Sequence, residues 1–184
     1  MGFASGDIDR DAFGIRQFAA DDQEFIIAQS FAKNMGLYGE RVGAVTFVTK
    51  SPEQASTILS QIEGFVKAMY WSPPNHGVRI ATEILSDAEL CSEWRADVKG
   101  MTERLTSVRH SLRQHLEKWG SARDWSRITD HVGWFTYSGL NSLECECLTN
   151  KYSVHITKDG RMALTGVNPS NIEYLAYAIR EVTN

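Results

Sequence analysis

Lys33 is the residue of this sequence whose surroundings best suit covalent chemistry. It follows a short apolar run in a glycine-containing stretch, with Ser30 three residues before it and Arg41 eight residues after it. Burial and neighbouring cations lower the pKa of a lysine, and Schiff-base formation requires a neutral amine. A serine hydroxyl and an arginine fork suit a phosphate group. Spacing alone, however, favours a solvated lysine and arginine in a surface loop. Other segments of the chain are needed to decide between such a loop and a covalent site.

The cysteines and histidines do not form a metal-binding pattern. Cys145 and Cys147 would place both thiols on one face of a strand, but no second pair or nearby histidine cluster completes a zinc site. His110 and His115 lie on a predicted helix at a spacing that does not stack them, and no His-Glu-x-x-His motif occurs. Three cysteines in 184 residues indicate reduced thiols. We therefore expect no metal.

The composition is that of an ordinary globular protein, with 42% hydrophobic and 23% charged residues. The formal net charge is -4 and the isoelectric point is about 5.7. Nucleic-acid binding needs a basic surface, so that class of partner is not expected. No run approaches the ~20 apolar residues that cross a bilayer, and residues 2–11 do not resemble a signal peptide, so no membrane association is expected.

The first part of the chain has the pattern of an α/β sheet. Glu24–Ala28 and Ala44–Val48 are continuous apolar runs of strand length, which are typical of a sheet covered on both faces. Ser51, directly before a proline and an acidic residue, predicts a helix start. The prolines in residues 71–77 exclude helix there.

The second part has the pattern of a smaller α+β lobe. Residues 78–85 form a predicted helix, and a longer helix capped by Ser86 or Asp87 should extend to about Trp119 with one apolar stripe. The stripe residues recur three or four positions apart: Leu90, Trp94, Val98, Met101, Leu105, Val108, Leu112 and Leu116. Strands are predicted at residues 134–137, 153–156 and 162–164, a connection at 120–130, a turn at 159–160 and a closing helix at 171–182.

Five segments of the chain resemble motifs of class I aminotransferases of the aspartate aminotransferase type. The longest, Ser30–Gly43, resembles the cofactor-lysine signature of that family across nearly all its fixed positions. The others look like the family's glycine-rich loop, proline-rich loop, small-domain strand and terminal arginine motif: residues 2–7, 72–77, 134–140 and 159–162. Their order and spacing hold, so the resemblance covers essentially all 184 residues.

The resemblance implies an enzyme that uses pyridoxal 5'-phosphate. The fold would be α/β: residues 1–80 would be a remnant of the large, cofactor-binding domain of a fold type I transferase, with a mostly parallel sheet. Residues 81–184 would be its α+β small domain. The reaction would move an amino group from L-aspartate, or another amino acid, to 2-oxoglutarate, with L-glutamate and oxaloacetate as the other partners. A homodimer is expected for the complete enzyme, and a cytoplasmic location, with a mitochondrial one left open.

The resemblance also implies a role for each matching residue. Lys33 would hold the cofactor and shuttle the substrate proton. Ser30 and Arg41 would bind the cofactor phosphate. Arg161 would bind the substrate α-carboxylate as a bidentate fork, and Phe135 would line the substrate site.

Two positions depart from the family pattern. Ala32 stands where a second serine is common before the lysine, which removes one hydroxyl near the phosphate. Lys67 stands where aspartate-specific members carry an arginine, which they use across the dimer interface for the side-chain carboxylate of the substrate. Lysine keeps the charge and loses the bidentate fork, so Lys67 is expected to bind substrate with weaker selectivity for dicarboxylates.

Residues on which the family depends would precede Met1. These are the aspartate that pairs with the pyridine nitrogen, the tyrosine near the phenolic oxygen and the amino-terminal half. Three interpretations follow: half of an aspartate aminotransferase, half of a broad-specificity enzyme of the aromatic or kynurenine type, or an inactive fragment that binds a partner subunit. The proline-rich loop favours the first, Lys67 favours broad specificity within it, and the isolated chain is expected to be inactive.

Overall fold

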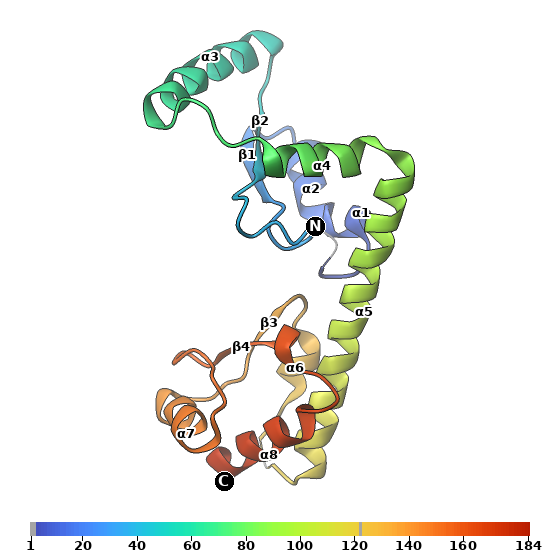
Figure 1. Cartoon of the computed structure of the whole chain (residues 1–184), viewed down its shortest axis with the longest axis vertical. Helices are drawn as coiled ribbons and strands as arrows, with labels where there is room; N and C mark the ends of the chain where they lie inside the picture. Colours follow the sequence, from blue (N-terminus) through green and yellow to red (C-terminus); the bar gives the residue numbers. More distant parts are fainter. Residues whose placement is uncertain (1–2, 122) are drawn as a thin grey trace. The chain divides into compact units, whose positions relative to one another are not determined.

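The computed structural model describes residues 3–121 and 123–184, which divide into two units (Figure 1). Unit 1 contains Ile8–Val98, and unit 2 contains Phe3–Asp7 and Lys99–Asn184. The long helix α5 (Ala88–Lys118) begins in unit 1 and ends in unit 2. Gly2, the first residue of the predicted glycine-rich loop, lies outside the described residues. The predicted domain boundary near residue 80 concerns the complete protein and stays a prediction.

Unit 1 contains a sheet of two strands, β1 (Phe25–Ser30) and β2 (Gly43–Val48), which confirms both strands predicted from the apolar runs. The strands pair antiparallel, as the edge of a mostly parallel sheet can. Ile26 on β1 and Val45 on β2 are each 63% exposed. The expectation that both faces are covered is wrong for this chain taken alone, because successive side chains point to opposite faces and one face is left open.

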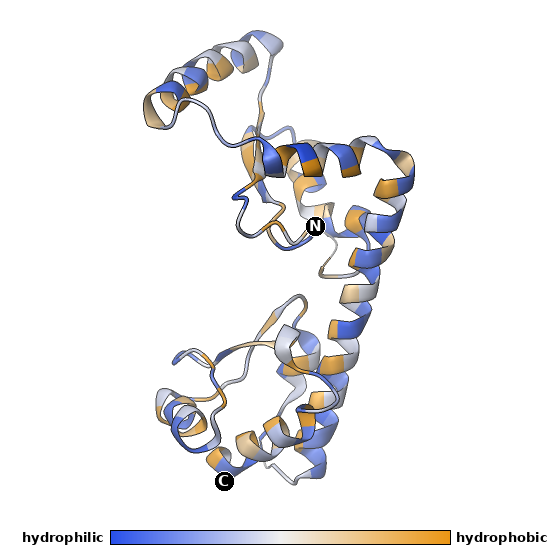
Figure 2. Ribbon diagram, in the orientation of Figure 1, coloured by the Kyte–Doolittle hydropathy of each residue, from blue (hydrophilic) through white to orange (hydrophobic). Residues whose placement is uncertain are grey.

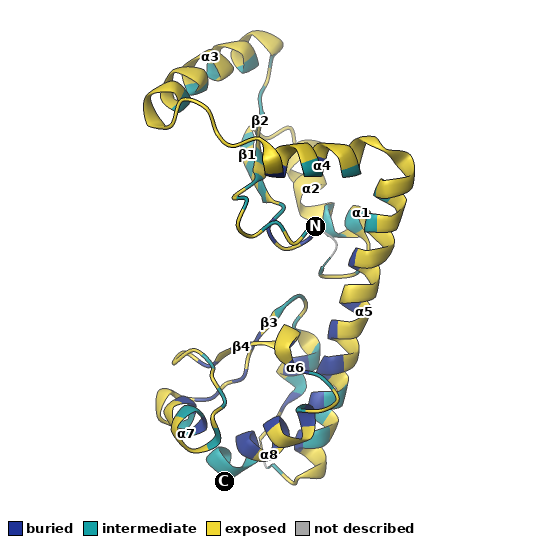
Figure 3. Cartoon of the chain, viewed as in Figure 1, coloured by how far each residue is buried: buried dark blue, intermediate teal, exposed yellow. Residues whose placement is uncertain are grey.

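Four helices complete the rest of unit 1. They are α1 (Ile8–Asp11), α2 (Phe13–Ala20), α3 (Pro52–Met69) and α4 (His76–Ser86). The sequence did not predict α1 or α2, whereas α3 begins as predicted: the Gln54 N–H donates to Ser51 Oγ at 3.2 Å. None of the residues described in α3 is buried, and Phe65 and Met69 are 66% and 75% exposed. Figures 2 and 3 show apolar residues along α3 that are left exposed.

Unit 2 has its core between the second half of α5 and the closing helix α8 (Ile172–Thr183). The intervening elements are α6 (Ser126–Asp130), β3 (Phe135–Tyr137), α7 (Ser142–Tyr152), β4 (Arg161–Ala163) and the 3-10 helix η1 (Leu164–Gly166). The predicted stripe on α5 is confirmed where it lies in this core, at Leu105, Val108, Leu112 and Leu116. Its members Leu90 and Met101 are each 39% exposed, so the stripe is wrong there.

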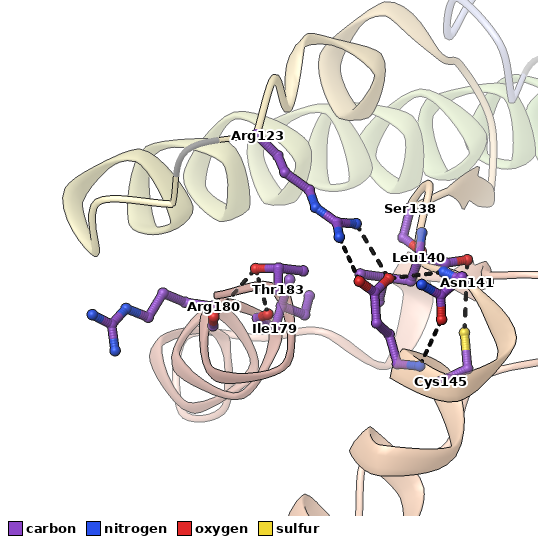
Figure 4. A network of polar contacts seen from close by, with 9 residues as sticks. Arg123, Ser138, Leu140, Asn141, Cys145, Ile179, Arg180 and Thr183 are labelled. Carbon is purple, nitrogen blue, oxygen red and sulfur yellow. Dashed lines mark hydrogen bonds and ion pairs between the residues drawn. The ribbon is translucent and has the colours of Figure 1, made fainter.

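Cys145 and Cys147 lie on helix α7, so the prediction that they share a strand face is wrong. Asn141 and Glu144 form a capping box that begins the helix: the Glu144 N–H donates to Asn141 Oδ1 at 3.0 Å, and the Asn141 N–H donates to Glu144 Oε2 at 2.8 Å. Arg123 also forms an ion pair with Glu144 (Figure 4). Burial raises the pKa of the Cys145 thiol, which keeps it protonated near neutral pH.

Three connections differ from their predictions. Helix was excluded from residues 71–77, but α4 begins at His76, two residues after the last proline. Residues 153–156 form no strand: Ser153 ends α7 in the left-handed conformation, with a φ of 53°. Val154 and Ile156 do alternate inward, which explains the predicted strand, but neither belongs to a strand pair among the described residues. The predicted connection 120–130 contains the short helix α6, where Asp124 accepts a hydrogen bond from the Ser126 N–H at 2.8 Å. The other predicted strands and the closing helix are confirmed.

Candidate active site

The loop that joins β1 to β2 carries Lys33. Ser30, the last residue of β1, is paired with Gly43, the first residue of β2, and the Phe31 N–H donates to the Val42 carbonyl at 3.1 Å. A side chain at Gly43 would place its Cβ 2.1 Å from the Gln29 carbonyl oxygen, so glycine is required there. The two ends of the loop are therefore held together, and its side chains project from a fixed base.

Two of the predicted site residues, Lys33 and Arg41, contact the same residue of this loop, and Ser30 lies at its start. The Lys33 amine lies 4.1 Å from the centre of the Tyr38 ring, and Arg41 Nη1 donates to the Tyr38 carbonyl at 3.0 Å. Arg41 has a left-handed backbone, with a φ of 51°. Ser30 Oγ accepts a hydrogen bond from the Ala32 N–H at 3.1 Å. That bond does not use the hydrogen of the Ser30 hydroxyl. Tyr38 thus links the lysine to the arginine, a part that the sequence did not assign to it.

Neighbouring helices hold the same loop from outside. Trp94 Nε1 of α5 donates to the Asn34 carbonyl at 2.7 Å. At the start of α4, a Cβ on Gly77 would lie 2.6 Å from the Glu40 Cβ, so only glycine allows this close approach. Ala32, one of the two residues that depart from the family pattern, is buried at 6% exposure.

In unit 2, Arg161 and Phe135 lie on one face of the β3–β4 pair. Tyr137 is paired with Arg161 and Phe135 with Ala163, so Phe135 and Arg161 are diagonal neighbours. The centre of the Arg161 guanidinium lies 5.1 Å from the centre of the Phe135 ring. Both side chains are exposed, and Met162, between Arg161 and Ala163, is buried. The pair therefore presents a cation to solvent from an anchored strand.

The predicted turn at Asp159 and Gly160 sets the direction of Arg161. The Arg161 N–H donates to Asp159 Oδ1 at 3.2 Å, and the Thr157 hydroxyl donates to the same oxygen. These bonds, chiefly that from Thr157, hold the pKa of Asp159 below its ordinary value. Gly160 has a φ of 78°, and a Cβ there would lie 2.7 Å from the Leu140 carbonyl oxygen, so glycine is needed on both grounds.

Lys67 lies on a different element, in the last turn of α3. Its amine is 5.3 Å from the centre of the Trp71 ring. Trp71 is 70% exposed and has a φ of 57°. The sequence did not predict this contact, although an aromatic residue four positions after a lysine was its available signal.

Each group of residues suits a particular chemistry. The loop offers an amine, a hydroxyl and a guanidinium, which suit a ligand that has both a carbonyl and a phosphate. The Arg161 guanidinium suits a carboxylate. Within residues 3–121 and 123–184, no group of three or more His, Cys, Asp or Glu side chains could hold a metal ion, and no helix is long and apolar enough to cross a membrane.

The fold is that of part of a fold type I transferase, which the solved structures described below share. The chain belongs to the class I and II aminotransferases, whose family model matches residues 1–179. It is 47% identical over 183 residues to the mitochondrial aspartate aminotransferase of Gallus gallus. The match covers 100% of this chain and 43% of that relative. The chain thus spans less than half the length of the curated relatives it matches.

Solved structures agree with this assignment. A mitochondrial aspartate aminotransferase from Trypanosoma brucei has a TM-score of 0.96 at 40% identity, over 100% of this chain and 48% of that chain. An aromatic-amino-acid aminotransferase from Burkholderia pseudomallei, covalently bound to pyridoxal phosphate, has a TM-score of 0.96 at 34% identity, over 100% and 46%. The predicted family, enzyme class and fold class are confirmed. The roles of the individual site residues stay predictions.

Proposed function

We propose that this chain is the carboxyl-terminal half of an aspartate aminotransferase that moves an amino group from L-aspartate to 2-oxoglutarate. The observation that carries the proposal is that Ser30 begins the loop on which Lys33 and Arg41 both contact Tyr38, in a chain that covers 43% of an aspartate aminotransferase at 47% identity. This turnover is proposed for the complete protein, because more than half of the relatives' length lies outside this chain.

The donor set of the loop fits pyridoxal 5'-phosphate. The Lys33 amine matches its aldehyde, and the Ser30 hydroxyl and the Arg41 guanidinium match its phosphate. When bound, this cofactor supplies an electron sink for the substrate Cα. Lys33 contacts the Tyr38 ring, and Arg41 donates to the Tyr38 carbonyl, so the amine and the guanidinium both contact the same residue of the loop.

Lys33 is the proposed acid and base at the substrate Cα. An amine that can leave the cofactor is free to take the Cα proton and to return it one step later. The Tyr38 ring, 4.1 Å from the amine, restricts the directions in which the lysine side chain can point. This restriction favours one position for the proton transfer.

Arg161 is the proposed site of the α-carboxylate. Its planar guanidinium can donate two parallel N–H bonds to a carboxylate, which a lysine cannot do. The Phe135 ring, whose centre lies 5.1 Å from the guanidinium, borders the site with an apolar surface.

A broad-specificity aminotransferase is the second candidate, and Lys67 is the observation that favours it. A point charge near the exposed Trp71 ring can attract a side-chain carboxylate without fixing its orientation, and the ring offers apolar surface to a larger side chain. One solved relative is named as an aromatic-amino-acid aminotransferase. Dicarboxylates would then be accepted with weaker preference.

A homodimer is proposed for the complete protein. Its support is the family resemblance, which places Lys67, in the last turn of α3, at the dimer interface of the complete enzyme. The cytoplasmic location stays a prediction, and the mitochondrial names of the relatives describe those proteins.

The proposed function is tested by turnover of the purified complete protein. With pyridoxal 5'-phosphate and 2-oxoglutarate present, we expect L-aspartate to yield oxaloacetate and L-glutamate, and L-phenylalanine to react at a lower kcat/KM. Turnover of L-phenylalanine at the higher kcat/KM would favour the broad-specificity candidate. Turnover of neither amino acid would contradict both.

Replacing Lys67 with arginine is expected to raise the preference for dicarboxylates. The regained bidentate contact is worth on the order of 1–3 kcal/mol, so the ratio of kcat/KM for aspartate over phenylalanine should rise roughly tenfold to hundredfold. Lys50→Arg is the matched control, because the Lys50 amine pairs with Asp22 at 2.7 Å on the same unit. An unchanged ratio in Lys67→Arg would remove Lys67 from the substrate site.

A further inference from the structure

Arg109, on α5 in unit 2, is a buried cation whose acceptors are backbone carbonyls. Arg109 is only 4% exposed. Nη1 donates to the Ile128 carbonyl at 2.7 Å, and Nη2 donates to the carbonyls of Gly133 and Phe135 at 2.7 and 2.8 Å. Among the residues that the structure describes, no ion pair of Arg109 occurs.

A cation in this position is costly, so its contacts must provide something that an apolar side chain would not. Burial lowers the pKa of Arg109, yet a guanidinium stays charged in proteins. Leu105, Val108 and Leu112 surround it in sequence on the core face of α5, where an apolar residue would fit the helical spacing. The difference that the arginine makes is its fork of donors, which reaches three carbonyls at once.

The three carbonyls lie on the segment that leads into the proposed carboxylate site. Ile128 belongs to α6, Gly133 lies in the connection after it, and Phe135 is the first residue of β3. Strand β3 pairs with β4, which carries Arg161 opposite Tyr137. The position of β3 therefore sets the place of the Phe135 ring and, through the strand pair, that of Arg161.

We propose that Arg109 is a positioning residue for the substrate carboxylate: it fixes the start of β3 against α5, so that Phe135 and Arg161 are held in the arrangement that binds a carboxylate. This inference rests on the proposed role of Arg161. Arg109 does not touch the substrate, and its effect is transmitted through three carbonyls and one strand pair.

The experiment measures carboxylate binding separately from turnover. The Kd of succinate, which is aspartate without its amino group, is determined by titration calorimetry for the complete protein, and the Tm of each variant is recorded. Arg109→Lys keeps the charge and loses the fork. Arg113→Lys is the matched control: Arg113 lies one turn further along α5 and donates to Thr129 Oγ1 of α6 at 2.9 Å, but within the described residues its side chain makes no hydrogen bond to β3.

Gly133→Ala is a second variant, in case Arg109→Lys does not fold. Gly133 has a φ of 83°, and no atom lies within 4 Å of the Cβ that alanine would add, so the substitution strains the backbone at one of the three carbonyls without a clash. Gly133→Ala perturbs the hydrogen bond between Arg109 and the Gly133 carbonyl at the carbonyl rather than at the guanidinium.

Arg109→Lys, or Gly133→Ala in its place, is expected to raise the Kd of succinate roughly tenfold, since misplacement by about 1 Å can cost about 10²-fold in a site. Arg113→Lys should change it less than twofold. In a protein that already carries Arg161→Lys, the same variant should add no further loss, because coupled residues are not additive.

Three results would overturn the inference. A lowered Tm with an unchanged Kd in the Arg109 or Gly133 variant would show a purely structural role. Full additivity with Arg161→Lys would show that the variant does not act through Arg161. If Arg161→Lys leaves the Kd of succinate unchanged, the proposed carboxylate site is wrong and the inference fails with it. If Arg161→Lys raises the Kd but Arg109→Lys does not, the inference fails and the proposed function stands.

Discussion

Replacing Lys33 with alanine in the complete protein is expected to lower kcat for L-aspartate by at least about 10⁴-fold. The amine would be lost both as the group that holds the cofactor and as the acid and base at the substrate Cα. A positioned acid or base alone typically contributes about 10²–10⁴-fold, so the combined loss should lie at or beyond the upper end. The measurement is steady-state turnover of L-aspartate and 2-oxoglutarate.

The matched control is Lys50→Ala. Lys50 lies in the same unit just after β2, and its amine pairs with Asp22, away from the loop that carries Lys33. Its turnover should stay within about twofold of the unchanged protein. Borohydride reduction with pyridoxal 5'-phosphate, followed by peptide mapping, should label Lys33. Even labelling of the surface lysines, or turnover retained by Lys33→Ala, would contradict the assignment.

The lysine loop could be predicted from the sequence because its determinants are local. Ser30, Lys33 and Arg41 lie within twelve residues, and the strands on either side are short apolar runs that bring the ends of the loop together. The Asp159–Gly160 turn before Arg161 is local in the same sense, because one glycine and one acceptor define it. Local patterns thus predicted the strands and the turn, whereas the choice of Lys33, Ser30, Arg41 and Arg161 as site residues came from the family resemblance.

Helix α7 shows where a local pattern misleads. Two cysteines with one residue between them fit a strand, and the apolar alternation that follows them supports that interpretation. The signal that decides spans four residues: Asn141 and Glu144, three positions later, each bonded to the backbone of the other. A capping box outweighs alternation because it satisfies N–H groups that the first turn of a helix leaves without partners.

Arg109 shows a different limit of the sequence. Its spacing from Leu105 and Leu112 places it on the core face of α5, so its burial had a signal. Its partners had none, because all three are backbone carbonyls, which every residue has, 19 to 26 positions along the chain. The exposed sides of α3 and of the β1–β2 sheet could not be predicted either. Apolar patterns show that a face is suited to burial, and its partner decides whether it is buried.

The 184-residue chain on its own is expected to show no aminotransferase turnover above about one thousandth of that of the complete protein. It supplies the proposed proton shuttle and carboxylate arginine, but the resemblance places the partner of the pyridine nitrogen and half of the cofactor pocket outside it. Electrostatic preorganisation by such groups is often the largest contribution to a rate, and the loss of one such donor alone costs about 10²–10³-fold.

The same chain is expected to self-associate, because its apolar surfaces lack cover. Ile26 and Val45 leave one face of the sheet open, and Phe65 and Met69 do the same for α3. Supplying the amino-terminal half as a separate polypeptide should both restore turnover and reduce the association. The same apolar surface would bind the amino-terminal half or, in its absence, another copy of the chain. Sedimentation with and without that half measures the association, and turnover of L-aspartate measures the activity.

Full turnover by the chain alone would show that the residues outside it are not needed. Loss of association without any gain in turnover would instead favour a fragment whose role is to bind a partner subunit.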